Sequence, residues 1–198
     1  MQFKLQGACK YMLTSDCKGK TFSVRVRNDA RESRAFSWTR TVTLKVKEGR
    51  VTLGQKMRVK FNGKRVSLPF SSGTLQIEQD GYSALVSTGI GVKLLWDGDS
   101  FLEVAVPHRL QGRLCGLCGN FNGNQSDDFV TRRGGPVAHP MAFGQSWRVG
   151  GKKACSRPEE GKDSKFNFFF IQFKKSNFVY SQRQRSALQE KLATSPES

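Results

Sequence analysis

The chain has 198 residues, of which 37% are hydrophobic, and 33 lysines and arginines against 16 aspartates and glutamates give a formal net charge of +17. That length is enough for one domain with a buried core, and no run reaches the roughly 18 apolar residues that a membrane span needs. The positive charge suits a polyanionic partner, but no helix-turn-helix pattern, zinc finger or aromatic ribonucleoprotein signature points to nucleic acid.

Short segments with the composition of β-strands dominate the chain as far as residue 106. They are rich in β-branched and aromatic residues and mostly alternate apolar with polar side chains. In chain order the expected strands are residues 21–27, 41–47, 57–61, 74–78, 82–87, 92–96 and 101–106. Turn pairs between them, such as Asp80 with Gly81, favour tight hairpins because both residues tolerate positive φ. The pattern predicts an all-β fold, an antiparallel β-sandwich.

Basic residues alternate with apolar ones in three of these segments. On a strand, that spacing places the charged side chains on one face. The residues concerned are Arg25, Arg27, Lys45, Lys47, Arg58 and Lys60. Outside the cell, such a face predicts binding to heparan sulphate or matrix, and a face that only keeps the protein soluble is the alternative.

Residues 115–128 are the most informative stretch of the chain. Cys115 and Cys118 lie three apart, ahead of a glycine-punctuated run of asparagine and aspartate. A zinc site would need a second pair of soft ligands, and a redox motif would need a helix after its first cysteine. Oxygen donors in a tight loop suit calcium, and a solvated turn without an ion is the alternative. The candidate donors are Asn120, Asn122, Asn124, Asp127 and Asp128.

The run Cys-Gly-Leu-Cys-Gly-Asn-Phe-Asn-Gly from residue 115, with the two aspartates after it, resembles the signature of von Willebrand factor type D domains. Other landmarks occur in the family's order, namely Cys9, Tyr11, Cys17, Trp96, Trp147 and Cys155. The resemblance covers roughly residues 1–157 and leaves residues 158–198 as a short, irregular and flexible tail outside the family. Residues 28–31 with 36–39, and residues 96–101, are most similar to BMP-binding endothelial regulators of the crossveinless type, and next to kielin/chordin-like proteins.

The resemblance implies a pattern of disulfides and a cofactor. Cys9 would bond Cys155, Cys17 would bond Cys115, and Cys118 would be unpaired because its family partner lies upstream of residue 1. Calcium would bind the oxygen donors named above. That site is expected to be incomplete, since the family's upstream aspartate is missing from what reads as an N-terminally truncated domain.

Aromatic residues carry two further expectations. Trp96 and Trp147 are expected in the core, because a tryptophan in such a strand pattern is more often buried than exposed for binding. Residues 143–147 are expected to pack back on the sandwich and so bring Cys155 to Cys9.

The function implied is that of a secreted, non-enzymatic module of an extracellular BMP-signalling regulator, with BMP-family growth factors as partners of the full-length protein. The missing signal peptide is attributed to the same truncation. The alternative is a structural, adhesive assembly module of a mucin- or zonadhesin-like glycoprotein, in which Cys118 would join chains. A hydrolase or oxidoreductase lacks support, because there is no nucleophile elbow, no phosphate-binding glycine loop and only two histidines.

Overall fold

The computed structural model describes residues 2–5, 7–29, 37–137, 139–151, 154–155 and 169–172. The predicted flexible tail, residues 158–198, therefore lies outside the described residues except for one strand. That strand, β14 (Phe169–Gln172), pairs antiparallel with β1 (Gln2–Leu5) in a separate two-stranded sheet.

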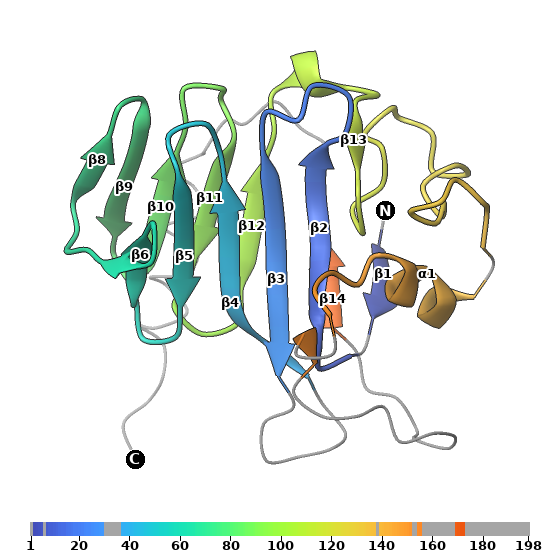
Figure 1. Ribbon diagram of the computed structural model, residues 1–198, viewed down its shortest axis with the longest axis horizontal. Helices are drawn as coiled ribbons and strands as arrows, with labels where there is room; N and C mark the ends of the chain where they lie inside the picture. The colour runs from blue at the N-terminus through green and yellow to red at the C-terminus, as the bar shows by residue number, and fades with distance from the viewer. Residues whose placement is uncertain are drawn as a thin grey trace, which may run out of the picture.

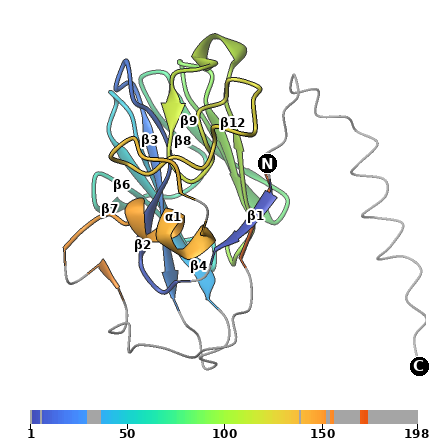
Figure 2. The ribbon, with the colours of Figure 1, turned by 90° about the vertical axis from the view of Figure 1, so that its right-hand side faces the viewer.

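The other strands form two antiparallel sheets that face each other (Figures 1 and 2). One contains β2 (Lys10–Asp16), β3 (Ser23–Asp29), β4 (Trp38–Lys45), β5 (Arg50–Gly54), β6 (Val59–Phe61), β7 (Lys64–Arg65) and β13 (Leu114–Cys115). The other contains β8 (Phe70–Ser72), β9 (Leu75–Asp80), β10 (Ser83–Ser87), β11 (Lys93–Trp96) and β12 (Leu102–Ala105). Their strand orders are β13-β2-β3-β4-β5-β6-β7 and β12-β11-β10-β9-β8. The predicted antiparallel sandwich is confirmed.

Helical structure is minor in the described part of the chain. It consists of the 3-10 turn η1 (His108–Leu110) and the helix α1 (Pro140–Ser146), which begins at a proline and follows His139. The His139 ring accepts a hydrogen bond from the N–H of Met141 (3.3 Å) and so caps the helix. No helix among these residues is long and apolar enough to cross a membrane.

The core lies between the two sheets, because alternation directs every second side chain of each strand inward. The inward side chains that are fully buried include Val24, Val26, Val42, Leu44, Leu53, Leu75, Ile77, Leu94 and Trp96. The Trp96 indole N–H donates to the carbonyl of Gly54 (3.0 Å) and so joins the five-stranded to the seven-stranded sheet. Trp147 is also buried, which confirms both tryptophan predictions.

Residues 143–149 return to the sandwich beside β2. The N–H of Met12 donates to the carbonyl of Trp147 (2.9 Å), and the N–H of Val149 donates to the carbonyl of Lys10 (2.8 Å). Phe143 is fully buried, and its ring lies 5.1 Å from that of Phe129. The chain is thereby directed towards Cys155, as the sequence predicts.

Candidate functional site

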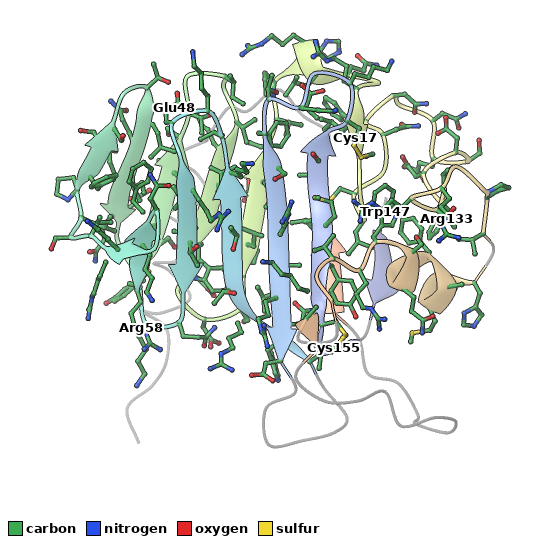
Figure 3. All side chains as sticks on the ribbon, in the orientation of Figure 1. Cys17, Glu48, Arg58, Arg133, Trp147 and Cys155 are labelled. Carbon is green, nitrogen blue, oxygen red and sulfur yellow. A yellow bond between two sulfur atoms is a disulfide. The ribbon has the colours of Figure 1, made fainter. Side chains whose placement is uncertain are left out.

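Both disulfides lie at the β2 edge of the seven-stranded sheet. One joins Cys9, just before β2, to Cys155, and the other joins Cys17, just after β2, to Cys115 in β13. Cys155 and Cys17 accordingly mark the two ends of β2 in Figure 3. These are the pairs that the family resemblance implies. A redox pair of Cys115 with Cys118 is excluded here, since Cys115 is bonded to Cys17.

Cys118 is a free thiol in a closed environment. It is only 6% exposed, and burial, followed by the charge of Asp128, raises its pKa well above the usual value. A thiol that stays protonated at neutral pH is a poor nucleophile. The side chain is therefore not placed to join a second chain, contrary to the role that the assembly hypothesis gave it.

The glycines of the cysteine motif are required by close packing. Gly116 has φ +130°, and a Cβ there would lie 2.5 Å from the carbonyl oxygen of Leu13 in β2. This approach lets the N–H of Cys118 donate to the same carbonyl (3.0 Å). Gly119 has φ +75°, and a Cβ there would collide with the carboxylate of Asp128. Any larger residue would separate the loop from β2 or displace that carboxylate.

The five predicted calcium donors lie in one loop after β13 (Figure 1). The side-chain oxygen of Asn120 accepts from the N–H of Asn122 (2.9 Å), and that of Asn122 accepts from the N–H of Asn124 (2.7 Å). Asp128 accepts from the N–H of Asn120 (3.2 Å), which ties the end of the loop to its start. The Asn122 amide donates to Asp127 Oδ2 (2.6 Å). The loop is thus ordered by its own oxygen atoms.

One oxygen of this loop fits a bound cation. Oδ1 of Asp127 is buried and has no hydrogen-bond partner in the described part of the chain. Among the same residues, no group of three or more His, Cys, Asp and Glu side chains is arranged to hold a metal ion. An ion here would therefore need amide and backbone oxygens besides the two carboxylates. Calcium accepts that mixture, so the donor set fits calcium better than zinc.

Asp16 organises the turn beside the second disulfide, and the sequence reasoning did not single it out. Its carboxylate accepts from the N–H of Gly19 (2.8 Å), the hydroxyl of Thr21 (2.7 Å) and the guanidinium of Arg113 (3.1 Å). Burial raises the pKa of Asp16, but these hydrogen bonds and the Arg113 charge together lower it below its usual value. The carboxylate thereby joins the β2–β3 turn to the segment that leads into β13.

The outward side of the seven-stranded sheet carries the second candidate site, which we call the basic face. It consists of Lys10, Arg25, Arg27, Lys45, Arg50, Lys60 and Arg65. Cross-strand register places Lys10 opposite Arg27, Lys45 opposite Arg50, and Lys60 opposite Arg65. No helix or strand of the described part covers β3, β4 and β5 on this side, which faces the viewer in Figure 3.

Four of the six basic residues predicted to share a strand face lie on the basic face: Arg25, Arg27, Lys45 and Lys60. Lys47 lies in the turn after β4, and Arg58 lies in the turn before β6, where its Nε donates to the carbonyl of Gln55 (3.1 Å). Lys10, Arg50 and Arg65 were missed. The alternation of Arg50, Val51, Thr52 and Leu53 was a signal for one of them.

Carboxylates are nearly absent from this side of the sheet. Within β2 to β7, all of which are described, the only acidic residues are Asp16, buried at its turn, and Asp29, which pairs with Arg40 (2.7 Å). Partial burial lowers the pKa of Lys10, and the charges of Arg25, Arg50 and Arg27 lower it further. The cations therefore repel one another, and no carboxylate of strands β2 to β7 neutralises them.

A profile of the von Willebrand factor type D domain matches residues 1–135, which is more than half of the chain. The chain belongs to the von Willebrand factor type D family. The matched residues include both sheets of the sandwich, the Cys17–Cys115 disulfide and the cysteine loop, and they end before α1 and Cys155.

Three relatives show how far the similarity extends. The chain is 36% identical to the IgGFc-binding protein of Homo sapiens over 162 residues, which are 78% of this chain and 3% of that protein. It is 36% identical to the alpha-tectorin of Homo sapiens over 155 residues, 74% of this chain and 7% of that protein. With the zonadhesin of Sus scrofa the identity is 35% over 150 residues, 72% of this chain and 6% of that protein. The chain therefore corresponds to a small part of each relative.

The finer assignment to BMP-binding endothelial regulators or kielin/chordin-like proteins is not supported, because these relatives are an IgGFc-binding protein, alpha-tectorin and zonadhesin. Residues 96–101, which suggested it, serve the fold. Trp96 is in the core, and Asp97 accepts from the N–H groups of Ser100 (2.9 Å) and Phe101 (3.0 Å) in its own turn. Such residues identify the domain and not the subfamily.

Proposed function

We propose that this chain is an extracellular, non-enzymatic module that contributes to adhesion or structural assembly in a larger glycoprotein. The observation that carries the proposal is the pair of disulfides, which close sequence separations of 146 and 98 residues at one edge of a type D sandwich. Disulfides of this kind form and persist in oxidising compartments. The similarity to zonadhesin favours the assembly hypothesis over regulation of growth-factor signalling.

The chemistry of the described residues supports a binding role. The free thiol of Cys118 is buried and protonated, and the ring of His139 is occupied as a helix cap. His108 lies in η1, and no nucleophile is hydrogen-bonded to either histidine in the described part of the chain. Nucleophilic catalysis needs such a pair, so this arrangement favours adhesion through surfaces over chemistry.

The proposal predicts adhesion that depends on the disulfide-stapled fold. Beads coated with the chain, produced through a secretory pathway, should adhere to cell-derived extracellular matrix. The matched control carries Cys17→Ala and Cys115→Ala and is coated at the same density. Adhesion equal for the two proteins, or peptide mapping that finds the four half-cystines reduced in the native chain, would contradict the proposal.

Calcium is proposed as the cofactor of this module. Asn120, Asn122, Asp127 and Asp128 would supply side-chain oxygens, and Asn124 would contribute through its backbone carbonyl. Satisfying the buried Oδ1 of Asp127 is the expected gain, because an unpartnered buried acceptor costs about 1–3 kcal/mol. A bound ion would hold the loop closed and would take no part in chemistry.

Calorimetric titration tests the cofactor. Binding weaker than roughly 10⁻⁴–10⁻³ M, the range typical of extracellular modules, is expected because the site is incomplete. Asp127→Asn should remove the binding, whereas Glu78→Gln, which makes the same charge change on the exposed side of β9, should leave it unaltered. Submicromolar binding, or equal binding by the two variants, would show that the site has been misassigned.

A further inference from the structure

We propose that the basic face binds a sulphated glycosaminoglycan that lies across strands β3 to β7. This inference rests on the proposed extracellular function and names the matrix component that the module would contact. It is carried by the register of the sheet, the chemistry of the outward side chains and the contrast with the opposite side of the sandwich.

The register supplies a continuous row of donors. Pairing places Arg25 opposite Thr43, Thr43 opposite Thr52, Thr52 opposite Lys60, and Lys60 opposite Arg65. Because neighbouring strands lie about 4.8 Å apart, this row extends about 19 Å across five strands. A linear polyanion along the row would meet a cation at each end and hydroxyl groups between them.

A second row runs parallel to the first, one pleat away. It places Ser23 opposite Lys45 and Lys45 opposite Arg50. Lys45, Arg50, Lys60 and Arg65 are all exposed, so their charged groups are open to solvent. Two cationic rows side by side offer contacts to sulphate groups on both edges of one chain.

The donor chemistry suits sulphate. Guanidinium, ammonium and hydroxyl groups all donate hydrogen bonds to anionic oxygens, and charge-assisted bonds are the stronger ones. The Nε of Arg25 is buried and has no hydrogen-bond partner among the described residues. That buried atom is out of reach of a surface ligand, so the face would bind through its exposed ammonium and guanidinium groups.

Nucleic acid fits the same face less well. Single strands are held by successive bases that stack on several aromatic side chains, and the only exposed aromatic residue of β2 to β5 is Trp38, at the start of β4. Duplex DNA is usually read by an element that enters the major groove, and a broad sheet face presents none. The sulphated polymer therefore matches the surface better.

The opposite side of the sandwich would not compete for the polymer. The outward positions of the five-stranded sheet include the acidic residues Glu78, Asp80 and Glu103. Strands β8 to β12 are all described, and Lys93 is the single cation within them. The two sides differ in sign, so the field of the domain directs a polyanion to the seven-stranded sheet.

Heparin binding measured against salt concentration tests the inference. The variant Lys45→Gln with Lys60→Gln removes two charges from the basic face. The control, Lys56→Gln with Lys93→Gln, removes two exposed lysines from the β5–β6 turn and from the five-stranded sheet, so both proteins have the same net charge.

Each lost contact should reduce the slope of log K against log salt by about 0.7–0.9. The basic-face variant loses two contacts. Relative to the unaltered chain, and with equal binding of the two proteins at 1 M salt as the reference, its binding at 0.15 M salt should be about 10- to 30-fold weaker. The control should bind like the unaltered chain. Circular dichroism and melting temperature should be the same for all three proteins, since the four positions are exposed.

Two results would overturn the inference. Equal weakening of both variants would show that net charge matters and that this face does not. Tighter binding of duplex DNA than of heparin at equal salt would assign the face to nucleic acid. If either result is found while coated beads still adhere to matrix, the inference alone fails. If the unaltered chain binds heparin but its beads do not adhere to matrix, the proposed function alone fails.

Discussion

The two sheets of this sandwich share one core and differ in their outward side chains and in their cross-links. Inward side chains of both are fully buried aliphatic and aromatic residues, because packing requires them. Only the seven-stranded sheet carries disulfides and a row of cations, whereas the outward side of the five-stranded sheet is mostly neutral or acidic. Folding does not require like charges to gather on one side. Burial, followed by the charges of Arg25, Arg50 and Arg27, lowers the pKa of Lys10, so gathering these cations opposes stability and is expected only if the face serves the proposed binding.

The largest expected effect tests whether the seven-stranded sheet depends on its cross-links. In Cys17→Ala with Cys115→Ala, the free energy of unfolding should fall by about 4–5 kcal/mol, because the unfolded chain regains the entropy of a loop about a hundred residues long. Urea unfolding followed by circular dichroism measures the change. Reduction of the unaltered chain should lower its stability further, since Cys9–Cys155 opens as well. A loss below 1 kcal/mol would mean that packing alone holds this edge.

The second effect separates the inner from the outer side of the five-stranded sheet, which has no cross-link. Leu94 and Leu95 are neighbours in β11, but Leu94 is fully buried and Leu95 is half-buried on the outward side. Leu94→Ala should cost about 2–5 kcal/mol through lost burial and a cavity. Leu95→Ala should cost clearly less. Thermal or urea unfolding compares them, and equal losses would show that the outward side is covered.

Alternation explains most of the strands that the sequence predicts, although β5 alternates as well and was overlooked. Strands β3, β4, β6 and β9 to β12 overlap the predicted segments, since one side of each faces the core. The pattern of β2 is not alternating because its register shifts between Met12 and Thr14 and because other segments pack along the edge opposite β3. Strands β7 and β13 have two residues each, too few to show any period.

The third effect concerns the turn that closes the seven-stranded sheet. The Asp16 side chain is fully buried, and Asp16→Asn should lower stability at pH 7 by about 1.5–3 kcal/mol, the range for hydrogen bonds to a charged group. Because its pKa is lowered in the fold, the carboxylate stabilises fully above about pH 4, its unfolded value, and less as pH falls through the folded value. The difference between the two proteins should shrink there. Urea unfolding at several pH values measures it.

The same-charge control for that experiment lies on the other sheet. Glu78→Gln alters an exposed side chain of β9 and should change stability by less than about 0.5 kcal/mol. The free energies of unfolding of Asp16→Asn and the unaltered chain could instead differ by the same amount down to pH 2. That result would show that the turn requires the shape of the side chain and not its charge.

The candidate sites differ in how much of them the sequence revealed. The oxygen donors of residues 120–128 are close in sequence, so their spacing alone suggests a shared loop. The basic face depends on register, and Lys10 meets Arg27 only because β2 and β3 pair there. The carboxylate of Asp16 reaches Arg113 across 97 residues, a contact that no local pattern shows. Contacts between distant segments are therefore what sequence reasoning missed.

The smallest effect tests the link between the sheets at the end opposite the Trp96 contact. Glu48, in the β4–β5 turn, accepts a hydrogen bond from the hydroxyl of Thr74, beside β9, and this bond lowers the pKa of Glu48. Thr74→Val should lower stability by about 0.3–1 kcal/mol at neutral pH, because an exposed charged contact contributes little. The loss should fade as pH falls below about 4, where the carboxylate is protonated in both states. A loss that is independent of pH would assign the effect to the threonine's packing, and the two sheets would then be joined at this end by their core alone.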